Sequence, residues 1–441
     1  MKARLVSKSR VTPRNIDNEI DSLKREKRYN SSESKEMGVL YRAQQAWDGL
    51  MAFRANRARL IRMTYGDQYS DLVEVDGQRM REDEYWAQQG VIPKKNNVIR
   101  KMVRSVNGVY KSQDTDFSAT ARDRKEQKLA EMYTKLLQAN RDINRMNELE
   151  LRLFEEFVIS ATVFLKESYG YKKRRKDTWT DIVSPNNIFF DGADLQDPRH
   201  WDISLIGQIH DLTFGELCSK FCKQKSDYTK LKNIYTNAND ERFIASYYQS
   251  KYRNRDALGG SFYTPIDPSL CRVIEVWSQE QKGRYRCHDW ATGDSYKVEE
   301  KDLQIAVINV NRYRIQEGLN AGMDRDDIAL IEYEWFVDNY WYYRFLTPLG
   351  DVLQEGETPF EHEEHPYTMK IHPFVDSKPH SLVEDSIDQQ KFINELVTMY
   401  MLMAKHSSKG LLMFPQDLLP DDIDIEDIAE EYTRVNGIIV Y

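Results

Sequence analysis

The sequence lacks the motifs by which nucleotide-dependent enzymes are usually recognised. Neither the P-loop pattern G-x-x-x-x-G-K-[ST] nor the dinucleotide pattern G-x-G-x-x-G occurs in its 441 residues. No glycine-rich loop is therefore available to hold phosphates with backbone N–H groups. No grouping of serine, histidine and aspartate, or of cysteine and histidine, stands out as a nucleophile with its base. We expect no catalytic residues and no cofactor.

Cysteine is scarce, and no metal-ligand spacing is complete. Four cysteines in a chain of this length suggest a reducing compartment without a disulfide framework. Cys218 and Cys222 lie four apart on an expected helix but lack a second pair, which favours buried thiols over a zinc site. His362 and His365 do not have the spacing of a zinc protease helix. Acidic residues in 421–427 suit the first turns of a helix. We expect no bound metal.

Long hydrophobic runs are also absent. No stretch approaches the roughly 18 apolar residues of a membrane span, and the N-terminal residues lack the apolar segment of a signal peptide. Aromatic residues make up 12% of the chain, which argues against a disordered protein. The net charge of −8 argues against a protein that wraps nucleic acid with its whole surface. It is compatible with a protein that lets DNA slide past.

The chain is long enough for two or three domains, and its elements are mixed. Residues 1–36 form a polar, basic stretch that predicts a flexible arm. Residues 118–163 predict long helices capped by Ser118 and broken near residues 140–142. An apolar stripe on the first helix indicates a helix-packing surface, formed by Leu129, Met132, Tyr133, Leu136 and Leu137.

Residues 163–190 change to β periodicity and predict a hairpin around the basic run 172–176. That run is either solvated or a contact for DNA or for an acidic partner. Residues 272–298 predict a meander of short strands. Two further strands are expected on either side of a turn at Asn339, and their aromatic residues suit ring contacts across paired strands. Fold class α+β follows from this alternation.

The stretch from Ser381 to Lys409 predicts one helix of about seven turns. Ser381 and Glu384 have the spacing of a capping box, and Gly410 offers a left-handed stop. Apolar residues recur along it at helical spacing: Val383, Ile387, Ile393, Leu396, Val397, Tyr400 and Ala404. An acidic helix and the apolar run N-G-I-I-V-Y follow, and we expect the chain to stop inside a domain.

Four stretches in this order carry a family resemblance. They are W-D-G-L…R-x-N-R…Y-G-D-Q with G-V-I-P-K-K-N-N-V-I, between Trp47 and Ile99; S-P-N-N-I-F-F-D, from Ser184 to Asp191; R-V-I-E-V-W, from Arg272 to Trp277; and S-L-V-E-D-S-I-D-Q-Q-K-F-I-N, from Ser381 to Asn394. The layout resembles the portal proteins of tailed bacteriophages, most closely those of short-tailed phages of the crAss-like group.

The resemblance implies a portal fold with a mixed α/β wing, a long stem helix and a partial α/β clip. Residues 37–380 would form the wing, residues 381–407 the stem helix and residues 408–441 the start of the clip. The family's second stem helix, tunnel loop and crown would lie beyond the part of the pattern that this chain covers. The stem helix would contact its copies through Ile387, Ile393, Leu396, Val397 and Tyr400. Lys391, Lys405 and Lys409 would face the DNA channel or pair between stems, although ordinary surface lysines fit equally well.

The resemblance also implies partners and a location. Twelve copies would form a ring at one capsid vertex of the virion, assembled in the bacterial host cytoplasm. Double-stranded DNA would pass through it during packaging and ejection without sequence-specific binding. The major capsid protein, the terminase large subunit and head-to-tail adaptor proteins would dock on it, with no membrane involved. The alternatives are another phage head or neck assembly protein and a nucleic-acid-processing enzyme with an unrecognised site.

Overall fold

The computed structural model describes residues 38–75, 77–113, 116–172, 174–191, 197, 199–236, 262–265, 267, 269–322, 324, 328–372, 374–375 and 378–407. They are 45% helical and 29% strand, which confirms the α+β class. They divide into two compact units. The first unit comprises the described residues up to Ala55 and those from Thr162 to Lys378, and the second comprises those from Asn56 to Ala161 and from Pro379 onward.

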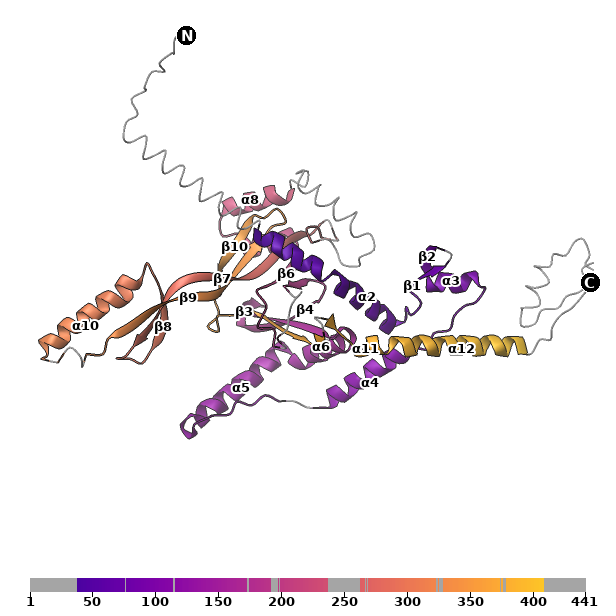
Figure 1. The fold of residues 1–441 in the computed structure, drawn as a ribbon, viewed down its shortest axis with the longest axis horizontal. Coiled ribbons are helices and arrows are strands. Elements are labelled where there is room, and N and C mark those ends of the chain that lie inside the picture. Colours follow the sequence, from indigo (N-terminus) through magenta and orange to yellow (C-terminus); the bar gives the residue numbers. More distant parts are fainter. Residues whose placement is uncertain are drawn as a thin grey trace, which may run out of the picture. The chain divides into compact units, whose positions relative to one another are not determined.

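An antiparallel sheet forms the centre of the first unit. Its order is β10-β9-β7-β6-β5, and β8 pairs with β7 (Figure 1). The strands are β5 (Ile188–Phe190), β6 (Leu205–Leu212), β7 (Cys271–Asp289), β8 (Ser295–Glu299), β9 (Ile331–Leu346) and β10 (Val352–Glu357).

Strands β7 and β9 are each continuous and lie side by side over their length (Figure 1). Their ladder runs from the pair Ile274 and Leu346 to the pair Asp289 and Ile331. The expected turn at Asn339 is wrong, because this residue lies inside the ladder opposite Gln281. The predicted meander of short strands likewise becomes one long strand followed by β8. A long partner strand satisfies backbone groups even where the side chains are polar.

A second sheet, in the order β11-β3-β4, contains the hairpin predicted from the sequence. It consists of β3 (Thr162–Lys172), β4 (Arg175–Val183) and β11 (Tyr367–Ile371). Phe164 and Val183 from this sheet pack in one cluster with Ile206 and Trp277 from the central sheet. Within the central sheet, Gly207 of β6 lies close to its neighbours, since an added Cβ would lie 2.2 Å from the Glu275 carbonyl oxygen of β7. Only glycine fits this position without displacing the neighbouring strand.

Helices cover the central sheet of the first unit. A helix over residues 38–49 places Val39, Leu40 and Trp47 against the sheet. Helix α7 (Phe214–Phe221) and helix α8 (Lys225–Thr236) pack at one end of β6. The thiols expected to be buried, Cys218 and Cys222, are half-buried there among apolar side chains, next to the buried Cys271. The π-helical turn η2 (Gln304–Ile308) and helix α10 (Asn309–Asn320) cover the distal part of β7 and β9.

The second unit is mainly helical. It contains most of α2 (Met51–Tyr65), the hairpin β1 (Leu72–Val75) with β2 (Gln78–Arg81), α3 (Glu82–Gln88), α4 (Val98–Ser112), α5 (Gln127–Asn144), α6 (Met146–Ser160), α11 (Leu382–Asp385) and α12 (Ile387–Ser407). Its apolar core joins α2, α4, α6 and the two C-terminal helices through Leu60, Met63, Ile99, Val103, Val158, Ile159, Val383 and Ile387.

Several predicted helix boundaries move in this unit. Helix α5 begins at Gln127 after a short 3-10 turn, so Ser118 is not its cap. The break before α6 falls at Arg145, whose φ is 51°, instead of residues 140–142. Ser381 caps α11 as predicted, since its Oγ accepts from the Glu384 N–H at 2.9 Å. The other bond of the predicted capping box is not formed, because the Glu384 side chain accepts from Asn56 instead. The predicted single helix is interrupted at Ser386 before α12 begins.

The predicted arm 1–36 and the predicted clip 408–441 lie outside the described residues. The acidic run 421–427 lies there too. Among the helices that the structure describes, none combines the length and the apolar character needed to span a membrane.

Candidate assembly surface on helix α12

The face of α12 that is buried in its own unit is polar. Gln390, Asn394 and Thr398 are 2%, 1% and 1% exposed. They are four residues apart, so they lie on one side of the helix. A buried polar stripe is stable only if its hydrogen bonds are satisfied.

The segment 94–99, which leads into α4, supplies those hydrogen bonds. The backbone N–H groups of residues 94, 96 and 98 donate to Thr398 Oγ1, Asn394 Oδ1 and Gln390 Oε1 at 2.9, 2.9 and 2.8 Å. In return, Gln390 Nε2 donates to the carbonyl oxygen of residue 96 at 2.7 Å. The side chains of α12 therefore replace the partner strand that this extended segment would otherwise need.

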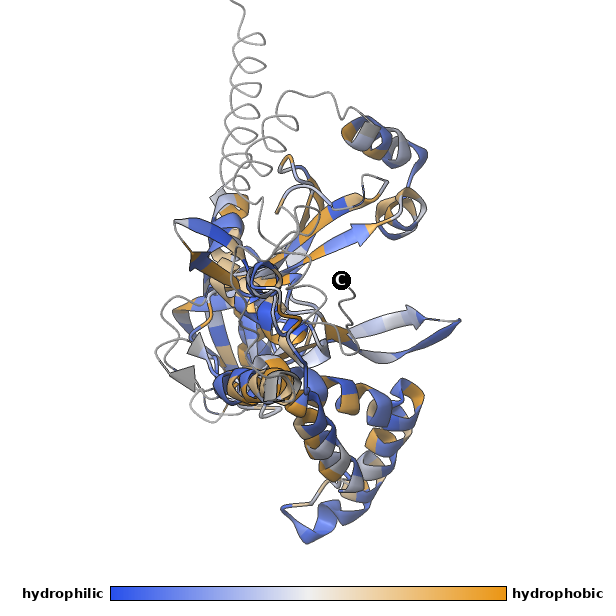
Figure 2. Cartoon of the chain, turned by 90° about the vertical axis from the view of Figure 1, so that its right-hand side faces the viewer, coloured by the Kyte–Doolittle hydropathy of each residue, from blue (hydrophilic) through white to orange (hydrophobic). Residues whose placement is uncertain are grey.

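The remaining surface of α12 carries large apolar side chains. Figure 2 shows hydrophilic and hydrophobic residues next to each other along the helices. On α12 six large apolar side chains are exposed, with fractions between 37% and 76%. Five of them lie on one side of the helix, and we call these the outer stripe: Phe392, Leu396, Met399, Tyr400 and Met403. Contiguous exposed apolar side chains are typical of interaction surfaces.

The residues predicted for the helix interface divide into three groups. Leu396, Val397 and Tyr400 are exposed on α12. Ile393 is half-buried and lines a small hollow that also includes Met102. Ile387 is 3% exposed in the core of the second unit. This burial corrects its predicted role, because a side chain held in the core of its own unit cannot contact another copy.

Lys391 has acidic partners within its own unit. Its Nζ lies 2.8 Å from Asp71 Oδ2 and 3.2 Å from Glu82 Oε2. Burial lowers the pKa of Lys391, but the hydrogen bond and charge of Asp71 outweigh it and raise the pKa overall. The charge predicted to face DNA or a neighbouring stem is thus balanced inside the unit. The side chain of Lys405 and the whole of Lys409 lie outside the described residues.

A second apolar stripe lies on α5. The side chains predicted to pack there are exposed, with fractions from 46% to 61%: Leu129, Met132, Tyr133, Leu136 and Leu137. No residue of α5 is fully buried. The predicted helix-packing surface is therefore not covered within the described structure, and smaller or polar residues such as Ala130 and Thr134 take the less exposed side.

The first unit buries a charged cluster between its two sheets. Glu275 is 1% exposed and forms an ion pair with Lys166. His210 Nε2 lies 2.6 Å from Glu275 Oε2, and Trp277 Nε1–H donates to Glu275 Oε1 at 2.9 Å. Burial alone would raise the pKa of Glu275, but Lys166 and His210 hold it well below its usual range. These contacts balance the buried charge and tie β3 to β6 and β7.

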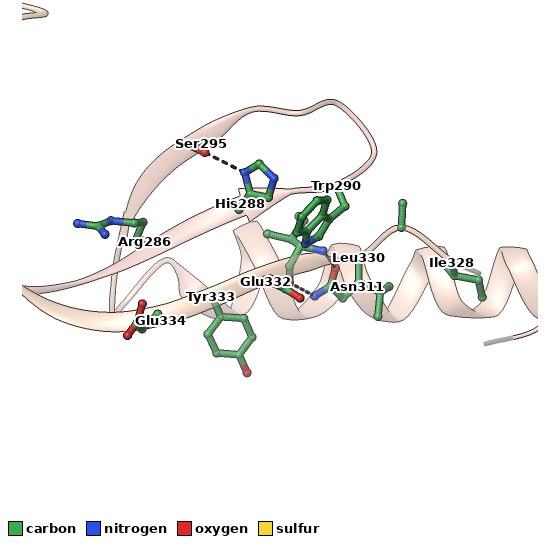
Figure 3. A pocket seen from close by; sticks show the side chains of 12 residues that line it. Arg286, His288, Trp290, Ser295, Asn311, Ile328, Leu330, Glu332, Tyr333 and Glu334 are labelled. Atoms are coloured by element: carbon green, nitrogen blue, oxygen red, sulfur yellow. Dashed lines mark hydrogen bonds between the residues drawn. The ribbon is translucent and has the colours of Figure 1, made fainter. Parts of the chain in front are cut away.

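A hollow of about 990 Å³ lies where β7, β8, β9 and α10 meet (Figure 3). Several of its polar groups hold the fold together. His288 Nδ1 lies 2.9 Å from Ser295 Oγ, and the Asn311 amide makes hydrogen bonds of 2.8 Å to both backbone groups of Ile331. In the part of the chain that the structure describes, no three histidine, cysteine or acidic side chains are grouped to hold a metal.

An α+β protein that turns two apolar helical stripes outward, one of them fixed by a buried polar ladder, has the features of an assembly protein. Comparison with known families identifies the particular one. The profile of the phage P22-like portal proteins matches residues 42–441, and the chain belongs to this family. No curated protein matches it. Membership gives the chain a structural role as a phage portal protein in the virion capsid and implies, in general, an oligomeric ring associated with capsid and terminase.

Proposed function

We propose that twelve copies of this chain form a ring at one capsid vertex, which is the channel for genome packaging and ejection. Family membership supports the portal role, and the outer stripe of α12 supports self-association. We also propose the domain limits expected from the sequence: wing 37–380, stem helix 381–407 and the start of the clip at 408–441. Similarity to the portals of crAss-like phages rests on the four sequence stretches described above.

The single observation that carries the ring proposal is the reversed polarity of α12. Its polar stripe is buried against its own unit, while Leu396 and Tyr400 are 48% and 76% exposed. Removing apolar area from water is worth about 25 cal/mol per Å². In a ring, α12 of one copy would gain this by packing its outer stripe against the next copy.

The proposed channel passes duplex DNA of any sequence. Each phosphate that a protein neutralises adds affinity, so a channel rich in positive charge would slow the movement of DNA. The net charge of −8 and the neutralised Lys391 suit a channel that does not hold its cargo. Terminase large subunit, head-to-tail adaptors and major capsid protein are the proposed protein partners, with assembly in the bacterial host cytoplasm.

The test is the oligomeric state of the double variant Leu396→Glu, Tyr400→Glu. Glutamate keeps helix propensity, and both positions are exposed, so the stability of the chain should change by no more than about 0.5 kcal/mol. Native mass spectrometry and electron microscopy should show twelve-membered rings for the unchanged chain. The double variant should remain monomeric with an unchanged circular dichroism spectrum.

The matched control is Glu395→Ala, an exposed change on the same turn that leaves the outer stripe intact. It should form rings like the unchanged chain. Rings of normal size from the double variant would contradict the α12 interface. An unchanged chain that stays monomeric but binds capsid protein would favour another head or neck assembly role.

A further inference from the structure

The β3–β4 hairpin extends beyond the sheet that contains it. Strand β11 pairs only with residues Thr162–Lys166 of β3. The β3–β4 ladder continues to the pair Lys172 and Arg175. The described residues 170–172 and 174–177, which we call the ribbon tip, therefore belong to a two-stranded ribbon.

Side-chain contacts across the strands hold the ribbon in shape. A two-stranded hairpin alone is at best marginally stable in water. Here Trp179 Nε1–H donates to the Gly170 carbonyl oxygen at 2.8 Å. Lys172 forms an ion pair with Asp181, and its Nζ lies 5.7 Å from the centre of the Trp179 ring. These contacts preorganise the ribbon tip without burying it.

The ribbon tip carries positive charge that the hairpin does not balance. Arg175 pairs with Asp177 at 3.0 Å. Arg174, with a φ of 67° at the turn, and Lys176 have no acidic partner among the residues that the structure describes. Tyr171 beside them is 76% exposed. The tip thus presents two uncompensated cations and a phenol to solvent.

Two arginines of α2 show the opposite arrangement, because they pair with carboxylates of the fold. On α2, Arg57 lies 2.6 Å from Glu156 and Arg59 lies 2.7 Å from Asp71. These ion pairs balance the charges of both arginines within the second unit. Arg174 and Lys176 differ from these arginines, because a preorganised ribbon holds their charges in solvent without an acidic partner in the described part of the chain.

We propose that the ribbon tip binds duplex DNA through its phosphates, without reading base sequence. Arginine, lysine and tyrosine are the usual side-chain partners of DNA phosphates. A two-stranded β-ribbon also fits the major groove of B-DNA. Stacking on several unpaired bases is disfavoured, because Lys176 lies over the Tyr169 ring at 5.0 Å and Lys172 lies over Trp179, which leaves Tyr171 as the one uncovered ring of these three. This site is additional to the proposed channel and does not depend on α12.

The test is the affinity of the complete chain for a random 30-base-pair duplex, measured by fluorescence anisotropy over a series of salt concentrations. The slope of log K against log salt is negative, and its magnitude grows with the number of phosphate contacts. Removing two contacts in Arg174→Gln, Lys176→Gln should reduce that magnitude by about 2. Affinity near 0.1 M salt should fall by about 10-fold or more. The charge-preserving variant Arg174→Lys, Lys176→Arg should keep both values.

The matched control is Lys230→Gln, Lys232→Gln, which removes the same charge from exposed positions on α8. It should change the salt slope little. Equal losses in control and tip variants would overturn the site, because the effect would then reflect net charge alone. A tip variant that loses binding to polyglutamate but not to DNA would overturn the DNA assignment in favour of an acidic partner. Tighter binding of oligo-dT than of duplex would overturn the duplex assignment.

The same samples separate this inference from the ring proposal. Ring formation by native mass spectrometry should be unchanged in the tip variant, because the ribbon tip lies in the first unit and the outer stripe lies in the second. Normal rings with unchanged DNA affinity would reject the ribbon tip alone. Failure of the unchanged chain to form rings would reject the ring and leave the DNA measurement valid.

Discussion

Strand β7 and helix α12 differ in which of their side chains are buried. The first eight residues of β7, Cys271 to Ser278, are all buried, and most of them are apolar. Helix α12 buries Gln390, Asn394 and Thr398 and exposes large apolar side chains. The strand is completed by its own unit, whereas the helix leaves its apolar surface uncovered in the described structure.

The difference has a clear energetic meaning. A buried hydrogen bond contributes a net stabilisation of only about 0.5–1.5 kcal/mol, so the polar ladder fixes the position of α12 more than it drives folding. The apolar area of the outer stripe remains available for association with another chain. The buried residues of β7 therefore stabilise the first unit, whereas the outer stripe of α12 adds little to the stability of its own unit.

The largest effect should come from truncating a leucine of β6, the strand paired with β7, and comparing it with the same truncation on α12. Leu205 is 1% exposed in the core of the first unit, while Leu396 is 48% exposed. We expect Leu205→Ala to lower the free energy of unfolding by about 2–5 kcal/mol. Leu396→Ala should change it by no more than about 0.5 kcal/mol. Urea unfolding of dilute, dissociated protein measures the free energy of unfolding of both variants. Equal losses would contradict the claim that Leu205 is buried in a core and Leu396 is not.

A substitution in the polar ladder should have a slightly smaller effect. Gln390→Leu would leave the N–H groups of Val98 and Ile99 and the carbonyl of Asn96 without their partner. An unsatisfied buried group costs about 1–3 kcal/mol. Residues 96 and 98 are exposed enough for water to replace their bonds, whereas Ile99 is buried, so we expect a loss of about 3 kcal/mol in unfolding free energy.

The control for this ladder prediction is Gln389→Leu, at the preceding, exposed position. It should be nearly neutral. Hydrogen exchange at the Val98 and Ile99 amides should accelerate in Gln390→Leu only. Unchanged protection of these two amides would show that the ladder does not fix the segment before α4.

The smallest effect should be the acid sensitivity of the contact between α12 and Asp71, the residue before β1. Burial would raise the pKa of Asp71, but hydrogen bonds from Arg59 and Lys391 lower it overall. A carboxylate with a depressed pKa stabilises the fold above its unfolded pKa, which is about 3.9, and this stabilisation is lost as pH falls below it. We expect a loss of about 1 kcal/mol for this partly exposed group.

The measurement is the thermal unfolding midpoint between pH 6 and pH 2.5, compared with Asp71→Asn. The unchanged chain should lose stability more steeply with falling pH than the variant does. Parallel pH profiles for the two proteins would show that the ionised Asp71 does not stabilise the fold.

Much of the local structure was predictable because it depends on near neighbours. Residues close together in the sequence predict three features that the structure contains: the Ser381 cap, the hairpin around residues 172–176 and the helical period of 387–407. Prediction failed where a distant strand decided the outcome. Asn339 looks like a turn residue, but pairing with β7 keeps it extended. Lys391 looks like a free surface lysine, but Asp71 and Glu82 lie more than 300 positions away in the chain.

The sequence by itself determined the α+β class, the helical and β periods and the order of motifs that resembles a portal. Only the tertiary structure decided which side of each helix is buried. An apolar stripe has the same period whether it faces its own core or another chain, so α5 and α12 could not be assigned from periodicity. On α12 the buried side is set by Gln390, Asn394 and Thr398. Their hydrogen bonds to residues 94–98 hold the polar side of the helix against its own unit.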